Sequence, residues 1–578
     1  MRQALASARR NAREGIMSKS ACIAAMLLLF GCGLAHAQAL PGDRELIRER
    51  QERVLEEQRL RLQELQQLPG ERAVVPPASS QPEAQCFAIQ LIRLSGAGLM
   101  TQAQQDALLL PFIGRCLGSA ELNNLLAAIT GFYLDRGYVT SRAYLPQQDL
   151  SDGELDVLVV EGVLEGLDSS ALASERELAM GFPGQPGERL NLRELEQLVD
   201  QLSRLPSRQL QLELLPGEQP GGSRVQLKGQ RSKPWHASLS RHNDGQRSTG
   251  EQQWGIGLDW DSPLGLGDQL RLRGGKDAVS DHWRHSASQS LFYSLPLGWW
   301  RLDYSYNQSY YRTRGEAGGL MYESDGESKG HQFGAERVVH RDNLGKTALC
   351  LGVAHLRTRN YLEDALLTTS SHRLSELQLG ANHGRRLGNA FVNLDVGWQQ
   401  GIGAFDAQSD DASGAGQPVA RYDKYSLTAS YLQPFELLGQ RLSVDSLLSG
   451  QYSSDVLFSP QRISLGGLAS VRGFKDQSLS GDSGYYWRSN LRWQYPISNL
   501  QLRPWLSQLG AAVGYDLGAI SGTPYNGRRH GRLSGSALEL SARGPHLAAS
   551  LTLAQSLSRP GVIARGEHPL YFRVDLFF

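Results

Sequence analysis

The stretch Trp300-Arg301-Leu302-Asp303-Tyr304-Ser305-Tyr306-Asn307 places apolar and polar side chains in alternation. Successive residues of a β-strand point to opposite faces, so this stretch predicts a strand with one apolar and one polar face. Residues 392–398 and 490–495 repeat the pattern, and short segments rich in Gly, Asp, Asn and Ser separate such stretches from about residue 231 onward. We therefore expect the C-terminal part of the chain to be all-β.

Two architectures could use such strands. In a soluble sandwich the polar face meets water, whereas in an outer-membrane barrel the apolar face meets lipid and the polar face lines a water-filled interior. Strands of about ten residues with aromatic side chains near their ends favour the barrel. The last strand carries Phe572, Val574 and Leu576 and ends on the terminal aromatic Phe578. At about 20 to 22 residues per strand and connection, residues 231–578 predict a transmembrane β-barrel of about 16 antiparallel strands.

The N-terminus is typical of an export signal. Basic residues precede an apolar core at 21–30, and Ala35-His36-Ala37 is a small-x-small cleavage site. We predict that residues 1–37 are a signal peptide, with lipoprotein cleavage before Cys32 as the alternative. No later apolar run reaches about 18 residues, so no spanning helix is expected. An exported chain without such a helix is either soluble or a transmembrane barrel.

Composition and motifs argue against several function classes. The chain has 59 basic and 59 acidic residues, which gives no long-range attraction to nucleic acid. Its histidines show no metal-ligand spacing, and no nucleotide motif is visible, so neither a metal nor another cofactor is expected. Gly481-Asp482-Ser483-Gly484 is similar to the nucleophile segment of trypsin-like proteases, but Tyr485 replaces the next glycine and no pattern supplies the partner His and Asp. We do not expect an enzyme.

The region between signal and barrel divides into four parts. Residues 43–68 predict a helix with a ragged apolar stripe, suited to solvent or to a water-filled pore, and the Pro-containing segment 69–83 predicts a linker. Two small α/β units follow at 84–162 and 163–230, each with short strands and amphipathic helices. In the first unit, Cys86 and Cys116 are expected to form a disulfide in an oxidising compartment, with two buried free thiols as the alternative.

One Gly-rich loop, at about 459–484, contains Val471-Arg472-Gly473-Phe474 and is called the inward loop below. Downstream, alternation at 509–518 places Asp516 on the polar face, with Gly514 and Gly518 as its neighbours on that face. These glycines leave room for a loop, and a guanidinium fits a carboxylate through two parallel hydrogen bonds. We expect the inward loop to fold into the lumen and Arg472 to pair with Asp516. A solvated surface-loop arginine is the alternative.

Several motifs together resemble the outer-membrane transporters of two-partner secretion, in the hemolysin-activator and contact-dependent-inhibition B branch of the Omp85 superfamily. The residues that carry the resemblance are Cys86-Phe87-Ala88-Ile89, Gly137-Tyr138-Val139-Thr140-Ser141-Arg142, Gly466 to Phe474, and Gly481 to Gly484. In their order and spacing they cover essentially the whole mature chain.

The resemblance implies an assignment for each part. Residues 38–68 would be a plug helix, 84–162 and 163–230 two periplasmic POTRA (polypeptide-transport-associated) domains, and 231–578 the outer-membrane barrel. The inward loop would lie between strands 11 and 12, and its arginine would pair with the aspartate of a pattern like Gly514-Tyr515-Asp516-Leu517-Gly518. Many members carry Phe where this chain has Gly514.

The function implied is export of a large partner exoprotein, such as a hemolysin, an adhesin or a contact-dependent-inhibition toxin. The POTRA domains would bind its N-terminal secretion domain, which would add a strand to a sheet edge. Other expected partners are outer-membrane lipid and, through the C-terminal strand ending at Phe578, the barrel-assembly machinery. A barrel-assembly factor of the same superfamily is the alternative function. A passive porin would lack the two α/β units.

Overall fold

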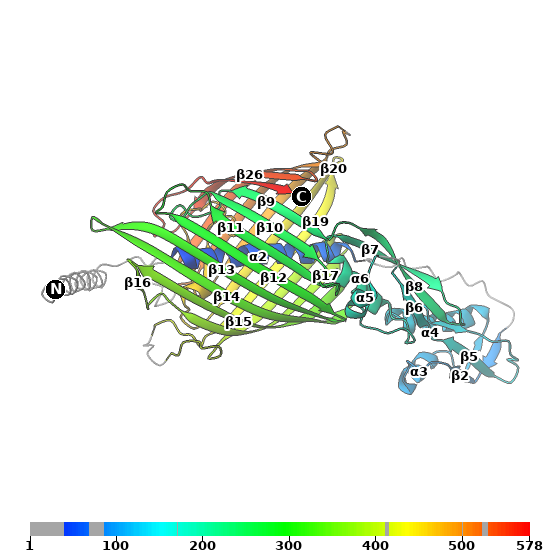
Figure 1. Ribbon diagram of the computed structural model, residues 1–578. Coiled ribbons are helices and arrows are strands. Elements are labelled where there is room, and N and C mark those ends of the chain that lie inside the picture. The colour runs from blue at the N-terminus through cyan, green and yellow to red at the C-terminus, as the bar shows by residue number, and fades with distance from the viewer. Residues whose placement is uncertain (1–39, 69–85, 170–171, 411–415, 500, 523–529) are drawn as a thin grey trace, which may run out of the picture.

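The computed structural model describes residues 40–68, 86–169, 172–410, 416–499, 501–522 and 530–578. A β-barrel, a helix within the barrel and two small α/β domains at one end of the barrel make up the molecule (Figure 1). The predicted signal peptide at 1–37 lies outside the described residues, and so does the predicted linker at 69–83.

Sixteen antiparallel strands form the closed barrel, which confirms the fold class, and β27 pairs with β9 to complete the cylinder. A two-residue strand, β16 (Ala365–Leu366), extends the hairpin of β15 and β17. The sixteen are β9 (Trp235–His242), β10 (Gln253–Asp261), β11 (Gln269–Asp277), β12 (His285–Leu297), β13 (Trp300–Ala317), β14 (Leu320–Arg341), β15 (Gly345–Leu362), β17 (Arg373–Leu387), β18 (Ala390–Ile402), β19 (Asp423–Leu437), β20 (Gln440–Tyr452), β23 (Gly484–Pro496), β24 (Gln508–Ile520), β25 (Gly531–Arg543), β26 (Leu547–Ser558) and β27 (Leu570–Phe577).

Alternation along the strands separates two surfaces. The apolar side chains of Val396 and Leu491 are exposed, whereas the neighbouring polar side chains of Asn393 and Asn490 are buried. An exposed apolar surface that runs around a closed barrel is typical of a wall that meets lipid. Strands β13 and β14 have 18 and 22 residues, and the tip of their hairpin extends past the barrel rim at the end opposite the α/β domains (Figure 1).

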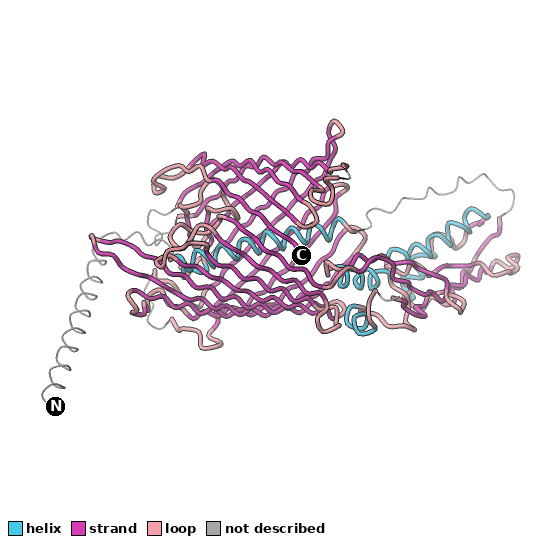
Figure 2. Tube along the Cα trace, turned by 45° about the horizontal axis from the view of Figure 1, so that its top comes forward, coloured by secondary structure: helices cyan, strands magenta, loops and turns pink. Residues whose placement is uncertain are grey.

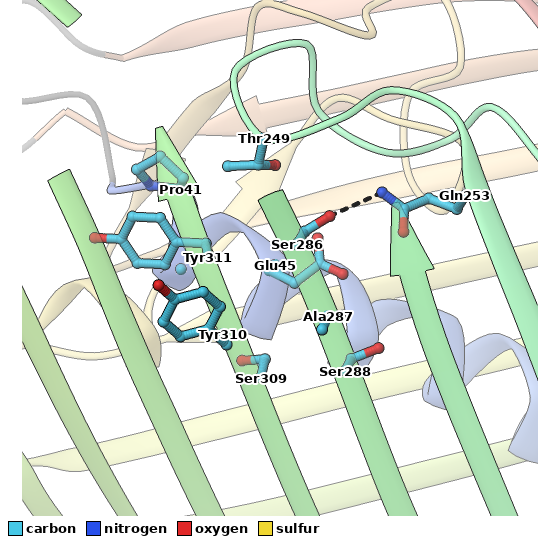
Figure 3. A pocket seen from close by; sticks show the side chains of 11 residues that line it. Pro41, Glu45, Thr249, Gln253, Ser286, Ala287, Ser288, Ser309, Tyr310 and Tyr311 are labelled. Carbon is cyan, nitrogen blue, oxygen red and sulfur yellow. Dashed lines mark hydrogen bonds between the residues drawn. The ribbon is translucent and has the colours of Figure 1, made fainter. Parts of the chain in front are cut away.

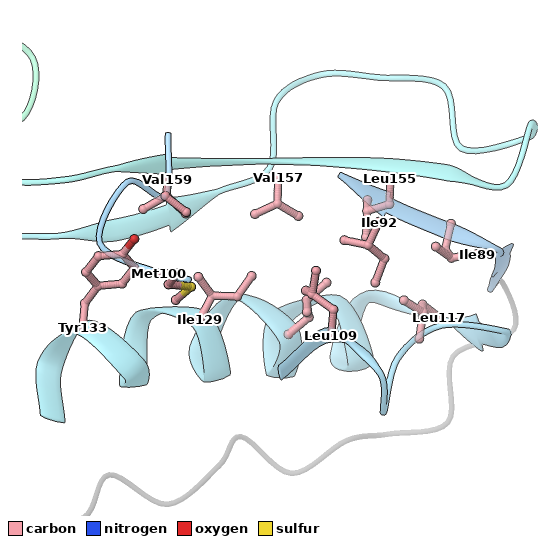
Figure 4. Packing of buried hydrophobic residues seen from close by; sticks show 12 residues of the cluster. Ile89, Ile92, Met100, Leu109, Leu117, Ile129, Tyr133, Leu155, Val157 and Val159 are labelled. Atoms are coloured by element: carbon pink, nitrogen blue, oxygen red, sulfur yellow. The ribbon is translucent and has the colours of Figure 1, made fainter. Parts of the chain in front are cut away.

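The first α/β domain has a three-stranded sheet in the order β2-β5-β4, with β2 parallel to β5, and a separate pair β1-β3. Apolar side chains such as Ile129 and Leu155 pack between the helices and the sheet (Figure 4), and Leu125 belongs to the same buried cluster. Residues 86–94 have the composition of one strand, but they form two, which Gln90 separates and which pair with different partners. Its elements are β1 (Phe87–Ile89), β2 (Leu91–Ser95), α3 (Gln102–Leu109), β3 (Arg115–Leu117), α4 (Ser119–Asp135), β4 (Arg142–Tyr144) and β5 (Glu154–Val160).

The second α/β domain repeats this topology. Its sheet has the order β6-β8-β7 with β6 parallel to β8, so in both domains the first strand pairs parallel with the third. Leu198 and Leu202 of the long helix are fully buried in its core. The elements are β6 (Val163–Asp168), α5 (Glu175–Gly181), α6 (Leu192–Ser203), β7 (Arg208–Pro216) and β8 (Gly222–Arg231).

Helix α2 (Pro41–Gln66) runs through the barrel lumen (Figures 1 and 2). Pro41 occupies its first turn. Proline is tolerated there because a backbone N–H at that position would have no partner within the helix. Only a few apolar side chains, among them Ile47 and Leu62, are buried, and many of its other side chains are charged. Across the described residues no helix is long and apolar enough to cross a membrane.

Candidate functional site

The inward loop lies inside the barrel, between β20 and β23, as a small folded unit. A 3-10 turn η1 (Ser459–Gln461) leads into the two-stranded pair β21 (Ile463–Leu465) and β22 (Leu479–Gly481). Val471 and Phe474 are fully buried and pack in one apolar cluster with side chains of the wall, among them Tyr486 and Leu533. The loop is therefore packed like a protein core rather than solvated.

Arg472 and Asp516 form a buried ion pair at the centre of this unit. Arg472 Nη2 donates to Asp516 Oδ1 at 2.6 Å and Nε donates to Oδ2 at 2.8 Å. The backbone N–H of Arg472 also donates to Oδ2, at 2.9 Å. The side chains are 2% and 0% exposed. Removing one partner of such a pair leaves the other charge buried and unpaired, at a cost of about 3–5 kcal/mol.

Glycines in the wall and in the loop make this close approach possible. A Cβ at Gly514 would lie 2.2 Å from Arg472 Nη2, and one at Gly518 would lie 2.8 Å from a methyl carbon of Leu465. In the loop, a Cβ at Gly473 would lie 2.5 Å from the carbonyl oxygen of Gln555. The guanidinium thus occupies the space that a side chain at position 514 would need, which explains how this chain packs the pair with glycine there.

Three further residues contact this unit and were not singled out from the sequence. Tyr571 Oη donates to the carbonyl oxygen of Arg472 at 3.1 Å, and Glu567 accepts from the loop backbone beyond Phe474. Arg488 lies across from Asp516 in the β23–β24 register, with its Nε 3.9 Å from Asp516 Oδ1. The alternation at 488–494 could have indicated Arg488, since it places that side chain on the lumen face. Nothing local indicates the other two.

Polar contacts hold helix α2 in the lumen. Near the inward loop, Arg44 Nη2 donates to the carbonyl oxygen of Asp476 at 3.1 Å and to Ser478 Oγ at 2.8 Å, and Gln51 Nε2 donates to the carbonyl oxygen of Ser464 at 2.6 Å. Further ion pairs and hydrogen bonds tie α2 to the wall: Arg48 with Asp244 (3.3 Å), Gln58 with Asp395 (2.6 Å), Arg61 with Glu336 (3.0 Å) and Glu64 with Lys346 (2.9 Å).

A small cavity lies between the first turn of α2 and the part of the wall that β10, β12 and β13 form (Figure 3). A Cβ at Gly42 would lie 2.7 Å from a ring carbon of Tyr311, so glycine allows the helix to approach this ring. Tyr311 Oη in turn donates to Asn360 Oδ1 at 2.9 Å, and Gln253 Nε2 donates to Ser286 Oγ at 2.9 Å. The helix start is therefore fitted to its position.

Two polar junctions connect the α/β domains to each other and to the barrel. Glu161 accepts from Arg189 Nε (2.5 Å), from the Leu99 N–H (2.7 Å) and from Tyr133 Oη (2.9 Å). Burial alone would raise the pKa of Glu161, but these donors hold it below its usual range.

Within the first α/β domain, Cys86 and Cys116 are joined by a disulfide with a Cα–Cα distance of 5.3 Å.

At the barrel junction, Glu177 of α5 pairs with Arg208 and accepts from Ser262 Oγ of the β10–β11 connection. Burial would raise the pKa of Glu177, but these two donors and the Ser174 N–H lower it to about 2. Lys346 Nζ of β15 lies between Glu64 of α2 (2.9 Å) and Asp200 of α6 (3.6 Å). The plug-like helix and the second α/β domain thus share one cation of the wall.

The protease-like motif, Gly481 to Gly484, makes structural contacts at the base of the inward loop. Asp482 Oδ1 pairs with Arg462 at 3.0 Å and accepts from the Leu457 N–H, while Ser483 Oγ donates to the carbonyl oxygen of Ser453. Within the described ranges, no group of three or more His, Cys, Asp or Glu side chains could hold a metal ion. At the C-terminus, Phe578 exchanges two backbone hydrogen bonds with Ala237 of β9.

Comparisons with known proteins agree with this geometry. Residues 221–542 match the family described as haemolysin secretion/activation protein ShlB/FhaC/HecB, residues 87–162 match the ShlB-type POTRA domain, and residues 163–216 match a further POTRA domain.

Individual relatives carry related names. The chain is 36% identical over 455 residues to the outer membrane transporter CdiB of Dickeya dadantii. The aligned region covers 78% of this chain and 81% of that protein. It is 31% identical over 452 residues to the hemolysin transporter protein ShlB of Serratia marcescens, which covers 78% and 79%. The solved structure of CdiB from Escherichia coli superposes with a TM-score of 0.88 at 34% identity, over 94% of this chain and 100% of that chain.

Proposed function

This chain belongs to the haemolysin secretion/activation family ShlB/FhaC/HecB, and from that premise we propose how its parts carry out export. It is an outer-membrane transporter of two-partner secretion, with its POTRA domains in the periplasm. The proposed division is a plug helix at 38–68, POTRA domains at 84–162 and 163–230, and the barrel at 231–578. No relative named above is a barrel-assembly factor, so the alternative function gains no support.

The proposed client is a large exoprotein that binds the POTRA domains before it crosses the membrane. Strand β7 supports this step, because it is a nine-residue edge strand whose Leu214 and Leu215 are each 39% exposed. An extended client segment could add to that edge through backbone hydrogen bonds, which tolerate different sequences. The binding preference of these domains would decide which client is exported: a hemolysin, an adhesin or a growth-inhibiting toxin.

Release of the plug helix is the proposed second step. The single observation that carries the proposal is that α2 occupies the lumen through hydrogen bonds and ion pairs with the wall, such as Arg61 with Glu336. Water can replace contacts of this kind once the helix moves, so the helix can leave without exposing a large apolar face. The client would then pass outward along the same polar wall.

The inward loop is the proposed gate, with Val471, Arg472, Gly473 and Phe474 as its centre and Asp516 as its partner. Its pairing to the wall would set the position of the loop while the plug leaves. Gly514 and Gly518 would supply the flat wall against which the loop lies. We propose no catalytic residue, cofactor, metal or nucleic acid partner.

Two membrane partners complete the proposal. The exposed apolar band of the barrel would meet outer-membrane lipid. The C-terminal strand would be the segment that the barrel-assembly machinery binds, because the side chain of Phe578 is 57% exposed while its backbone pairs with β9.

Deletion of residues 43–68 tests the plug. The deleted chain should show a larger conductance than the full chain in a planar bilayer, because the lumen loses the helix that fills it. A deletion with unchanged conductance would falsify the plug assignment. Replacement of residues 69–83 with a Gly/Ser segment of the same length is the matched control, because it changes the N-terminal region but keeps the helix and its reach.

A further inference from the structure

One short segment of the inward loop faces the plug helix and lies beyond the reach of the Arg472–Asp516 pair. Residues 475–478, here called the plug-facing segment, follow directly after Phe474. Arg44 of α2 donates to the carbonyl oxygen of Asp476 at 3.1 Å and to Ser478 Oγ at 2.8 Å. None of the hydrogen bonds that Asp516 accepts from the inward loop comes from this segment, since all three come from Arg472.

The carboxylate of Glu567 holds the backbone of this segment from the other side. Its Oε2 accepts from the N–H groups of Lys475 at 2.6 Å and Asp476 at 3.0 Å, and its Oε1 accepts from the N–H of Gln477 at 3.0 Å. Three successive backbone N–H groups directed at one anion form a nest, in which the charge strengthens every bond. The Gln477 side chain adds a fourth donor, at 3.0 Å.

Glu567 is itself fixed in the connection between β26 and β27. Its N–H donates to Ser556 Oγ at 2.8 Å. The Gln477 side chain reaches back to the same connection, accepting from the Ala564 N–H and donating to the carbonyl oxygen of Arg565, each at 2.9 Å. The plug-facing segment is thus bound to the outer connection that leads into the last strand of the barrel.

The β9–β10 connection supplies the remaining charged contacts of the segment. Lys475 Nζ pairs with Glu251, and Arg247 Nε lies 3.1 Å from Asp476 Oδ2. These side chains are partly exposed, so their pairs are weaker than the backbone contacts of Glu567. Glu567 is the one carboxylate of the described residues that binds the segment through its main chain.

We propose that Glu567 is a positioning residue of the gate, separate from Arg472 and Asp516. It holds the plug-facing segment where the Asp476 carbonyl and the Ser478 hydroxyl can accept from Arg44, and so sets how readily the plug helix leaves. This inference rests on the proposed function, because it requires that α2 is a plug. Loss of the carboxylate loosens the acceptors of Arg44 while the Arg472–Asp516 pair stays in place.

Single-channel recording in planar bilayers with the full chain tests the proposal. Glu567→Gln keeps the shape of the side chain but puts an amide N–H₂ against backbone donors. We expect the fraction of time spent open to rise about tenfold, which corresponds to about 1.4 kcal/mol. Glu436→Gln is the matched control, since Glu436 is 73% exposed near the end of β19, and it should behave like the unmodified chain.

A double-mutant cycle separates positioning from a general weakening of the barrel. Arg44→Ala should also raise the open fraction, and combining it with Glu567→Gln should add little, because both changes break the same contact. Additive effects would contradict the proposal, and so would an open fraction of Glu567→Gln equal to that of the control. Heat-modifiable migration on gels checks that each barrel is folded.

Two further comparisons keep the outcomes distinct. If Glu567→Gln does not fold, Gln477→Met removes the side-chain contacts to the outer connection and should give a smaller rise, whereas no rise would contradict the proposal. Deletion of 43–68 in the same recordings tests the plug itself. A silent deletion overturns the plug assignment, whereas a large effect of the deletion with none from Glu567→Gln overturns the role of Glu567 alone.

Discussion

The first POTRA domain packs an apolar core around Leu125 and Ile129, whereas the barrel lumen meets the plug helix with charged side chains such as Glu336. Exposing an apolar core to water costs free energy. A core of this kind therefore keeps a domain folded. Both partners of a hydrogen bond or ion pair in the lumen can bind water once the helix leaves, so the net cost of parting them is modest. The comparison teaches that apolar burial holds the POTRA domain together, whereas polar contacts that water can replace hold α2 in the lumen.

Arg472→Ala should give the largest effect, because this pair is polar yet buried as deeply as the POTRA core. We expect secretion of the client to be abolished while the barrel stays inserted, since the unpaired Asp516 costs about 3–5 kcal/mol and frees the loop. The measurement is client protein in the medium against client retained in cells. Arg441→Ala, at a 73% exposed side chain, is the control. Normal secretion by Arg472→Ala would remove the gate from the mechanism.

Leu125→Ala sharpens the apolar side of the comparison. This side chain is 0% exposed, so its truncation should lower the unfolding free energy of the first POTRA domain by about 2–5 kcal/mol. Pulse proteolysis of the full chain in urea, scored by the fragment that keeps residues 163–578, reports this domain. Leu110→Ala, at a 72% exposed position, should change little. Equal effects of the two variants would show that the core is not the source of stability.

Glu177 allows the junction between POTRA domain and barrel to be tested by pH. Its pKa is lowered from 4.5 to about 2, so its ionised form stabilises the folded junction at neutral pH. That contribution is complete above the unfolded pKa and is lost as pH falls through the folded value, between about pH 5 and 2. Thermal melting across this range should show a loss of stability that Glu177→Gln flattens. An identical slope in the variant would exclude Glu177 as its origin.

Glu64→Gln should give the smallest effect. The Glu64 side chain is 36% exposed, and such pairs contribute about 0–1 kcal/mol, so the open fraction of the channel should rise by about fivefold at most. Conductance recordings beside the deletion of 43–68 provide the scale. A change as large as that of the deletion would break the comparison, because it would make one lumen contact the main anchor of the plug.

Much of the barrel could be predicted because strand alternation is a local property. The period of two at 300–307 and 509–518 fixes which side chains face the lumen, and the glycines beside Asp516 indicated a bare strip. The division of the first POTRA strand at Gln90 was missed, since element boundaries depend on pairing partners rather than on the strand's own residues.

The rest of the site depends on contacts between distant segments. Tyr571 and Arg472 are 99 residues apart, and Arg44 and Ser478 are 434 apart. No periodicity links such positions, because the closure of the barrel and the seating of the plug bring them together. Gly514 is an intermediate case: the sequence marked it as a departure from the family, and the structure shows Arg472 filling the space.

The long β13–β14 hairpin has a practical consequence for work on intact cells. At 22 residues, β14 is about twice as long as a membrane-spanning strand needs to be, and the POTRA domains lie at the opposite end. Gly318 and Gly319 form its turn with positive φ angles of 60° and 80°, and a side chain built at either would meet nothing within 4 Å. An epitope tag inserted between them would label the cell surface, so antibody staining could count transporters without disturbing the wall.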